Sequence, residues 1–240
     1  MLIKYNTQTK SLIINFFFYV LKLPLSTTSF QSLKLEILNY KKIKNLELFN
    51  KVLLNNFSFY FMLFLSKGKK IDRSHNKKFL NFYLDIFKDQ NLETIIVKNK
   101  IELENVKKFI EKYMPVSLYD FEKLIENEIV CSPAHGDLHY KNVILKNNKY
   151  YIIDWGLYSK NSCYLFDLIN YKIFSSKYYK FNWFEILIKY RRKFYKFIDK
   201  RYIDLFIIWK INNELKFINL NAFKTEKYKK NLNYFFSNLY

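Results

Sequence analysis

Apolar residues divide the chain into a strand-rich beginning and a helix-rich remainder. Two apolar runs near the N-terminus, Leu12 to Leu23 and Phe57 to Leu65, are rich in Ile, Phe, Leu and Tyr, a composition that favours β-strands. Pro24 ends the first run, because proline cannot donate to a sheet ladder. Between the runs, Phe30 to Leu46 has apolar residues at helical spacing. We therefore expect a sheet lobe with one helix.

After residue 66 the apolar periodicity becomes that of helices. Apolar positions repeat at i, i+3, i+4 and i+7, a pattern typical of helices with one buried face. The predicted helices are Asn76 to Lys88, Glu102 to Tyr113, Leu118 to Glu128, Trp183 to Phe197 and Ile203 to Phe217. We place the boundary between the sheet lobe and the helical lobe near residue 66.

One predicted hairpin interrupts the helical region and carries polar side chains at its open end. Val143 to Leu145 and Tyr150 to Ile153 are apolar runs joined by a polar turn, with Asn142 just before the first and Asp154 just after the second. Strands linked by a tight turn lie side by side, so these two side chains should lie close together. An amide oxygen and a carboxylate are ligands that Mg²⁺ accepts in proteins. The sequence predicts Asn142 and Asp154 as metal ligands.

A third acidic residue, Asp137, lies five positions before Asn142 in the segment HGDLHYKN. It would stand beside the metal without having to bind it, free to orient a hydroxyl group and take its proton. An Asp and an Asn five residues apart, followed by a metal-binding Asp before a Gly, form the phosphoryl-transfer arrangement of protein kinases. Here Gly156 follows Asp154 by two positions, in the segment IDWG.

The segments HGDLH and IDWG, followed by Asp167-Leu168, resemble the aminoglycoside phosphotransferase and choline kinase-like superfamily, small-molecule relatives of the protein kinases. The resemblance implies an α+β, two-lobed protein kinase-like fold. A small N-terminal antiparallel sheet lobe with one helix, residues 1–66, would bind the nucleotide. A larger, mainly helical C-terminal lobe, residues 67–240, would hold the catalytic and substrate-binding residues.

The same resemblance assigns nucleotide-binding roles to Lys22 and Glu36. In the family a Y-V-L-K strand, here residues 19–22, supplies the lysine that holds the phosphates of ATP, and a helix glutamate pairs with it. The residues themselves leave other interpretations open. Lys22 fits an edge strand whose lysine faces water, a common protection against aggregation. Glu36 fits a solvated helix face, and Glu47 competes with it as the partner of Lys22.

The activity that the resemblance implies is ATP- and Mg²⁺-dependent phosphorylation of a hydroxyl group on a small molecule. The expected acceptors are a sugar of a surface glycan, an amino alcohol or an aminoglycoside, and an acidic saccharide would suit the positive charge of the chain. One departure from the kinase pattern is that no glycine precedes Gly68; the polar segment Asn6 to Ser11 would have to replace the glycine-rich loop. The alternative is therefore a catalytically weak or inactive kinase-fold binding protein.

Charge and cysteine content add limits on partners and location. The chain has 41 Lys and Arg against 21 Asp and Glu, a formal net charge of +20 at pH 7. Only four of the basic residues are arginine, the residue that reads bases and phosphates best, and the abundant Lys, Asn, Ile, Phe and Tyr are those with A/T-rich codons. We therefore expect no specific nucleic-acid partner. A polyanion-binding protein, whose lysines would grip nucleic acid or anionic lipid, is a further alternative. Cys131 and Cys163 show no metal-ligand or disulfide spacing, and no apolar run is long enough to span a membrane. A cytoplasmic protein is expected.

The predicted helix Trp183 to Phe197 combines an aromatic stripe with a basic run. Phe184, Tyr190, Phe194 and Phe197 fall at helical spacing, and core packing is the expected explanation. Arg191, Arg192 and Lys193 form the basic run. A solvated helix face explains it most simply, and an anchor for an acidic substrate is the alternative.

Overall fold

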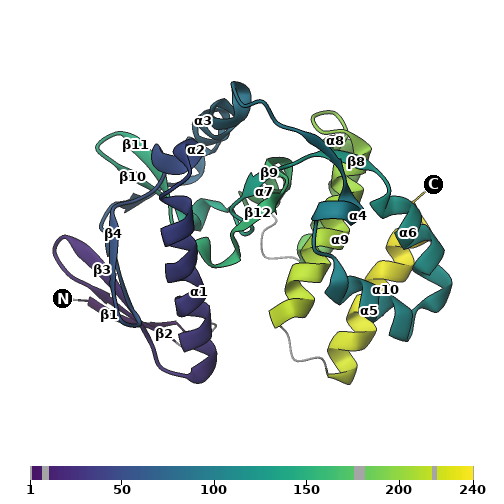
Figure 1. Ribbon diagram of the computed structural model, residues 1–240, viewed down its shortest axis with the longest axis horizontal. Helices are drawn as coiled ribbons and strands as arrows, with labels where there is room; N and C mark the ends of the chain where they lie inside the picture. The colour runs from purple at the N-terminus through teal and green to yellow at the C-terminus, as the bar shows by residue number, and fades with distance from the viewer. Residues whose placement is uncertain (1, 7–10, 176–181, 218–220, 240) are drawn as a thin grey trace. The chain divides into compact units, whose positions relative to one another are not determined.

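The computed structural model describes residues 2–6, 11–175, 182–217 and 221–239 (Figure 1). The chain forms two compact units. The first contains Met1–Asn91 and His135–Ser159, and the second contains Leu92–Ala134 and Lys160–Tyr240. These units group residues by packing, whereas the predicted boundary at residue 66 divides the chain by function; that boundary stays a prediction.

The first unit begins with an antiparallel sheet in the strand order β1-β2-β3-β5-β4. Its strands are β1 (Leu2–Asn6), β2 (Ser11–Asn15), β3 (Tyr19–Pro24), β4 (Asn56–Phe59) and β5 (Met62–Ser66). Strand β3 lies between β2 and β5, with Lys22 opposite Ile13 on one side and Leu63 on the other. Lys22 is therefore on a central strand of the sheet.

Each of the two apolar runs that predicted a single strand forms two strands. The first turns back between β2 and β3, where the Phe16 N–H donates to the Tyr19 carbonyl at 2.8 Å. The second turns at Tyr60, which has a left-handed φ of 50°. Glycine and asparagine usually occupy such turn positions. Because aromatic residues fill them here, the sequence has no turn signal. The predicted polar turn that should replace the glycine-rich loop, Asn6 to Ser11, falls mostly outside the described residues.

Helix α1 (Thr27–Ile43) confirms the predicted helix, beginning three residues earlier than the apolar pattern indicated. Ser26 caps it in a reciprocal arrangement with Ser29, whose backbone N–H donates to the Ser26 hydroxyl at 3.2 Å. The first turn of the helix is polar, so the pattern of apolar residues does not show where the helix begins. The buried face carries Leu33 and Ile37, and it also carries the polar residues Glu36 and Asn39.

The remainder of the first unit holds the predicted hairpin. Strands β10 (Val143–Lys146) and β11 (Lys149–Ile152) pair in antiparallel register, joined by Asn147 and Asn148 with left-handed φ values of 50° and 58°. Strand β6 (Lys69–Lys70) adds to the outer side of β10. Helix α2 (Glu47–Asn50) is short, and α3 (Asn76–Lys88) has the predicted bounds.

The second unit is mainly helical (Figure 1). Its helices are α4 (Val97–Lys100), α5 (Glu104–Tyr113), α6 (Leu118–Ile125), α7 (Tyr164–Ser175), α8 (Trp183–Phe194), α9 (Lys200–Phe217) and α10 (Ala222–Phe236). Two small sheets accompany them, β7 (Thr94–Ile96) with β8 (Glu128–Val130) and β9 (Ser132–Ala134) with β12 (Ser159–Ser162). Their apolar faces form one core that includes Phe109, Phe206 and Phe235. None of the described helices is long and apolar enough to cross a membrane.

Candidate functional site

Lys22 and Glu36 form a buried ion pair between strand β3 and helix α1. The Lys22 ammonium donates to both carboxylate oxygens of Glu36, at 2.9 and 3.0 Å. The side chains are 16% and 6% exposed. Lys22 therefore does not face water from an edge strand. Glu47, the competing partner, is exposed at the start of α2. The structure pairs Lys22 with Glu36, as the family resemblance implied.

Asp154 joins this pair from the end of the hairpin. Its Oδ1 lies 3.5 Å from the Lys22 ammonium, and its side chain is half exposed. Asp154 has the left-handed backbone conformation φ 68°, ψ 56°, which aspartate tolerates better than most residues. Burial alone would lower the pKa of Lys22, but the carboxylates of Asp154 and Glu36 outweigh it and raise that pKa above its ordinary value. Lys22 is thus held as a cation between two carboxylates.

Burial also acts on Glu36, whose pKa it raises, while the Lys22 ammonium acts to lower it. Because both oxygens of Glu36 accept from that ammonium, we describe the pair as ionised. Water competes little for either partner, because the two side chains are only 16% and 6% exposed, so the pair keeps its geometry.

Asn142 lies beside Asp154 through the hairpin ladder. The Ile153 N–H donates to the Asn142 carbonyl at 2.9 Å, which extends the pairing of β10 and β11 by one residue pair. Asp154 is the residue after Ile153, so it follows directly at the same end of the hairpin. The Asn142 side-chain amide donates to the Asp137 carbonyl at 3.1 Å, which leaves its Oδ1 as the atom that can bind a cation. An amide oxygen and a half-exposed carboxylate fit Mg²⁺, which prefers oxygen ligands and takes the rest from phosphates and water.

The loop that carries Asp137 is fixed by His135. The Asp137 backbone N–H donates to Nδ1 of His135 at 3.2 Å, and Nε2 of His135 lies 2.9 Å from the Ile153 carbonyl. Nδ1 accepts and Nε2 donates, so His135 is a neutral imidazole. It is fully buried against Trp155, with 4.7 Å between ring centres. His135 therefore sets the shape of the loop, and the Asp137 side chain remains 35% exposed.

His139 stands next to the Asp137 carboxylate. Its Nδ1 accepts from the Lys141 backbone N–H at 3.2 Å, which leaves the imidazole proton on Nε2. That nitrogen lies 3.6 Å from Oδ2 of Asp137. The His139 imidazole therefore lies beside the Asp137 carboxylate, just beyond hydrogen-bond distance.

Gly136 permits a close backbone approach within the same site. It has a φ of +88°, and a Cβ on it would lie 2.1 Å from the Leu157 carbonyl oxygen. A backbone atom at that distance leaves no room for any side chain. The glycine of HGD is therefore required for the loop that carries Asp137 to pass the 3-10 turn Trp155–Leu157 (η4) that follows Asp154.

Sequence analysis missed Asn39, which ties helix α1 to the turn after Asp154. Its side-chain amide donates to the Trp155 carbonyl at 2.8 Å and to the Gly156 carbonyl at 3.3 Å. It is 3% exposed. The sequence does contain a signal for Asn39: it is a polar residue three positions after Glu36, on the buried face of an amphipathic helix.

Lys70 on β6 was also missed. Burial lowers the pKa of Lys70, and the nearby charges of Lys141, Lys4 and Lys22 lower it further. The Asp154 carboxylate opposes the effect. Positive charge thus gathers around Lys70, with the Asp154 carboxylate close by. A bound polyanion would relieve the repulsion among these lysines.

The five predicted site residues therefore all lie in the first unit. Lys22, Glu36 and Asp154 meet directly. Asn142 is tied to Ile153, the neighbour of Asp154, by a backbone hydrogen bond, and its side-chain amide donates to the Asp137 carbonyl. The roles assigned to these residues stay predictions.

Comparisons with known proteins identify a protein kinase-like fold. No protein-family model matches the sequence, and a comparison with curated proteins gives no match. Among solved structures, choline kinase LicA from Streptococcus pneumoniae aligns with a TM-score of 0.58 at 15% identity, over 99% of this chain and 94% of that one. APH(2'')-IIa, in a ternary complex with streptomycin and ATP, aligns with a TM-score of 0.57 at 16% identity, over 97% and 91%.

A third structure, aminoglycoside phosphotransferase APH(2'')-Ib bound to ADP, aligns with a TM-score of 0.52 at 14% identity, over 94% of this chain and 88% of that one. At such identities the likeness establishes the fold. The predicted α+β, protein kinase-like fold class is confirmed, and so is the structural resemblance to choline kinases and aminoglycoside phosphotransferases. The activity has to be argued from the site.

Proposed function

We propose that the protein is an ATP-dependent phosphotransferase that phosphorylates a hydroxyl group of a small molecule. The observation that supports this most is the Lys22 ammonium, held between Glu36 and Asp154 at 2.9 and 3.5 Å. A buried lysine fixed by a helix glutamate beside a half-exposed aspartate is the arrangement with which kinases grip nucleotide phosphates. Structures with the same fold were solved with ATP and ADP.

In this proposal Lys22 binds the phosphates and Glu36 positions Lys22. The ammonium would exchange its contact with Asp154 for phosphate oxygens when the nucleotide binds, while its two hydrogen bonds to Glu36 hold it in place. The gathered charge of Lys70 and Lys141 would add to the attraction for a triphosphate. Asn142 and Asp154 would hold Mg²⁺, which neutralises charge on the phosphates when bound.

Asp137 is the proposed base for the acceptor hydroxyl. Its carboxylate is accessible, its backbone is fixed by His135, and His139 lies against Oδ2. It would accept a hydrogen bond from the hydroxyl, orient the oxygen towards the phosphate and take the proton as the bond forms. Because the transition state is loose, most of the acceleration would come from such positioning and from charge neutralisation.

For the acceptor we propose a chemical class and not a particular compound. The candidates are amino alcohols, aminoglycosides and sugars of surface glycans, with an acidic saccharide favoured by the net charge of +20. Structures with the same fold include a choline kinase and a complex with streptomycin. We place the reaction in the cytoplasm, where ATP is available and the buried thiols of Cys131 and Cys163 would stay reduced.

Turnover of ATP by the purified protein tests the proposal. Release of ADP would be measured against a panel of alcohols, amino alcohols, aminoglycosides and acidic and neutral sugars, with Mg²⁺ present and with EDTA. Acceptor-dependent turnover that requires Mg²⁺ supports the proposal. Nucleotide binding without turnover of any acceptor would favour the kinase-fold binding protein instead, the alternative suggested by the lack of glycine before Gly68.

A further inference from the structure

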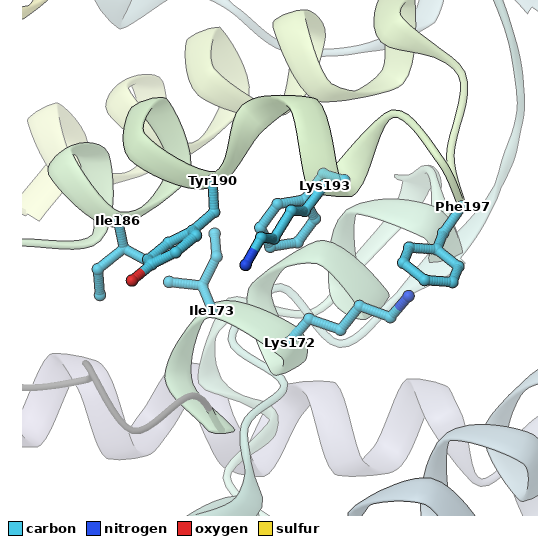
Figure 2. A pocket seen from close by; sticks show the side chains of 7 residues that line it. Lys172, Ile173, Ile186, Tyr190, Lys193 and Phe197 are labelled. Carbon is cyan, nitrogen blue, oxygen red and sulfur yellow. The ribbon is translucent and has the colours of Figure 1, made fainter.

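A pocket of about 340 Å³ opens between helices α7 and α8 of the second unit (Figure 2). None of the candidate site residues described above lines it. Its floor is apolar: Ile173 is fully buried and Ile186 is 4% exposed. Tyr190 and Phe194 pack partly buried along α8. A pocket of this size lies at the small end of the range typical for bound small molecules, about 300–1,000 Å³.

The aromatic stripe predicted as core accounts for much of this lining. Phe184 is buried, as predicted, but Phe197 is 72% exposed and forms one wall of the pocket with Phe194 and Tyr190. An exposed phenylalanine beside a concave apolar surface leaves apolar area in contact with water. A ligand with an apolar body would cover it.

Two lysines line the otherwise apolar pocket. Figure 2 shows Lys172 reaching from α7 towards Phe197, and Lys193 turning from α8 towards α7. The Lys172 ammonium lies 4.5 Å from the centre of the Phe197 ring, and the Lys193 ammonium lies 5.2 Å from that of Tyr190. Aromatic faces attract cations but do not neutralise them.

Among the described residues, these two charges have no acidic counterpart nearby. Over the described part of the chain, no carboxylate lies within ion-pair distance of Lys172 or Lys193. The sequence from residue 172 to 197 has eight Lys or Arg and one acidic residue, Glu185, which lies in the first turn of α8. Burial lowers the pKa of Lys172, the effect expected when an ammonium loses water without gaining a carboxylate.

We infer that this pocket binds an amphipathic anion, with an aliphatic or aromatic body against Ile173 and Phe197 and a phosphate, sulfate or carboxylate group between the ammonium groups of Lys172 and Lys193. The apolar floor would contact the apolar body of the ligand, and the ammonium groups of Lys172 and Lys193 would bind its anionic group. The inference does not depend on the proposed phosphotransferase activity. It gives the basic run on α8 a binding role through Lys193, whereas Arg191 is already paired with Asp204 at 2.6 Å.

Calorimetric titration with hexyl, octyl and decyl phosphate tests the apolar half of the inference. Each methylene that enters the pocket should strengthen binding by up to about fourfold. Octyl glucoside, which has the same tail and no charge, should bind much more weakly than octyl phosphate. Equal affinity for the three chain lengths, or no binding of any alkyl phosphate, would overturn the inference.

The charged half is tested by the variant Lys172→Met/Lys193→Met, in which methionine keeps the length of each side chain. The double variant should bind octyl phosphate about tenfold more weakly, because each partly exposed ion pair contributes about a few-fold in affinity. Lys196→Met is the matched control, because Lys196 is exposed on the same basic segment and does not line the pocket. If the control lost as much affinity as the double variant, the binding would reflect net charge alone and the inference would fail.

A second pair of measurements separates the two sources of such a ligand. Soluble octyl phosphate represents a free metabolite, and vesicles containing phosphatidic acid represent a membrane lipid. Loss of vesicle binding in the double variant assigns the pocket to a lipid, whereas loss of octyl phosphate binding alone assigns it to a soluble anion. Unchanged binding of both probes in the double variant overturns the inference.

Discussion

The side-chain amide of Asn39 donates a 2.8 Å hydrogen bond to the carbonyl of Trp155, the residue that follows Asp154. Glu36, one turn earlier on the same helix, holds Lys22. Helix α1 therefore fixes both the lysine proposed to bind phosphate and the turn that carries a proposed metal ligand. A shift of α1 would disturb both together.

Replacement of Asn39 tests this coupling. Asn39→Ala leaves the carbonyls of Trp155 and Gly156 without their donor, which should cost about 1–3 kcal/mol of stability. Because the turn after Asp154 loses its anchor, affinity for Mg²⁺-ATP should fall more than affinity for ATP in EDTA. Asn81→Ala, on the exposed face of α3, is the control and should change neither thermal midpoint nor affinity. Equal loss of the two affinities would indicate a general structural defect.

Lys22→Met should preserve the strand and remove the charge. In a partly desolvated site, loss of a phosphate-binding cation should lower kcat/KM by roughly a hundredfold or more. Glu36→Gln should have a weaker effect of the same kind, since Glu36 acts through Lys22, and the double variant should be little worse than Lys22→Met alone. Lys34→Met, exposed on α1, is the control. Simply additive losses would show that the ion pair does not act as a unit.

Asp137→Asn should abolish phosphoryl transfer and leave nucleotide binding nearly intact. The amide keeps the shape of the side chain but cannot take a proton from the acceptor. Turnover and ATP affinity would be measured side by side, with Asp85→Asn on the exposed face of α3 as the control. A parallel loss of ATP affinity would contradict the role assigned to Asp137.

Asp154→Ala should remove the dependence of nucleotide binding on Mg²⁺. The variant loses the carboxylate proposed to bind the ion, so affinity for ATP with Mg²⁺ should fall to the value that the wild-type protein has in EDTA. Lys22 would keep Glu36 as its partner, so the thermal midpoint should change little. Metal-dependent binding that survives the substitution would exclude Asp154 as the ligand.

Gly136→Ala should destabilise the protein, whereas Gly156→Ala should not. A methyl group on Gly136 meets the Leu157 carbonyl at 2.1 Å in a left-handed backbone conformation, while one on Gly156 meets nothing within 4 Å. The conformational cost alone is about 1–2 kcal/mol, and the clash adds to it. We expect a thermal midpoint lower by about 4–8 °C for Gly136→Ala. Similar midpoints for the two variants would refute the close approach.

Local sequence determined the elements in which neighbours in the chain are also neighbours in space. The hairpin of β10 and β11 is one, because two apolar runs around an Asn-Asn turn can pair in few ways, and it brought Asn142 and Asp154 to one end. Helix α3 is another, with the bounds that its periodicity predicted. The pairing of Lys22 with Glu36 came from the family resemblance, since periodicity leaves both residues free to face water.

Tertiary structure decided what depends on contacts between distant parts of the chain. Asn39 reaches Trp155 across 116 positions, and no local pattern specifies the partner of a buried polar group. Position 136 has to be glycine because the Leu157 carbonyl packs where a side chain would lie. Aromatic turns at Phe16 and Tyr60 are allowed because the sheet around them fixes the backbone. Apolar periodicity reports that a face is buried, and the fold alone determines which groups meet there.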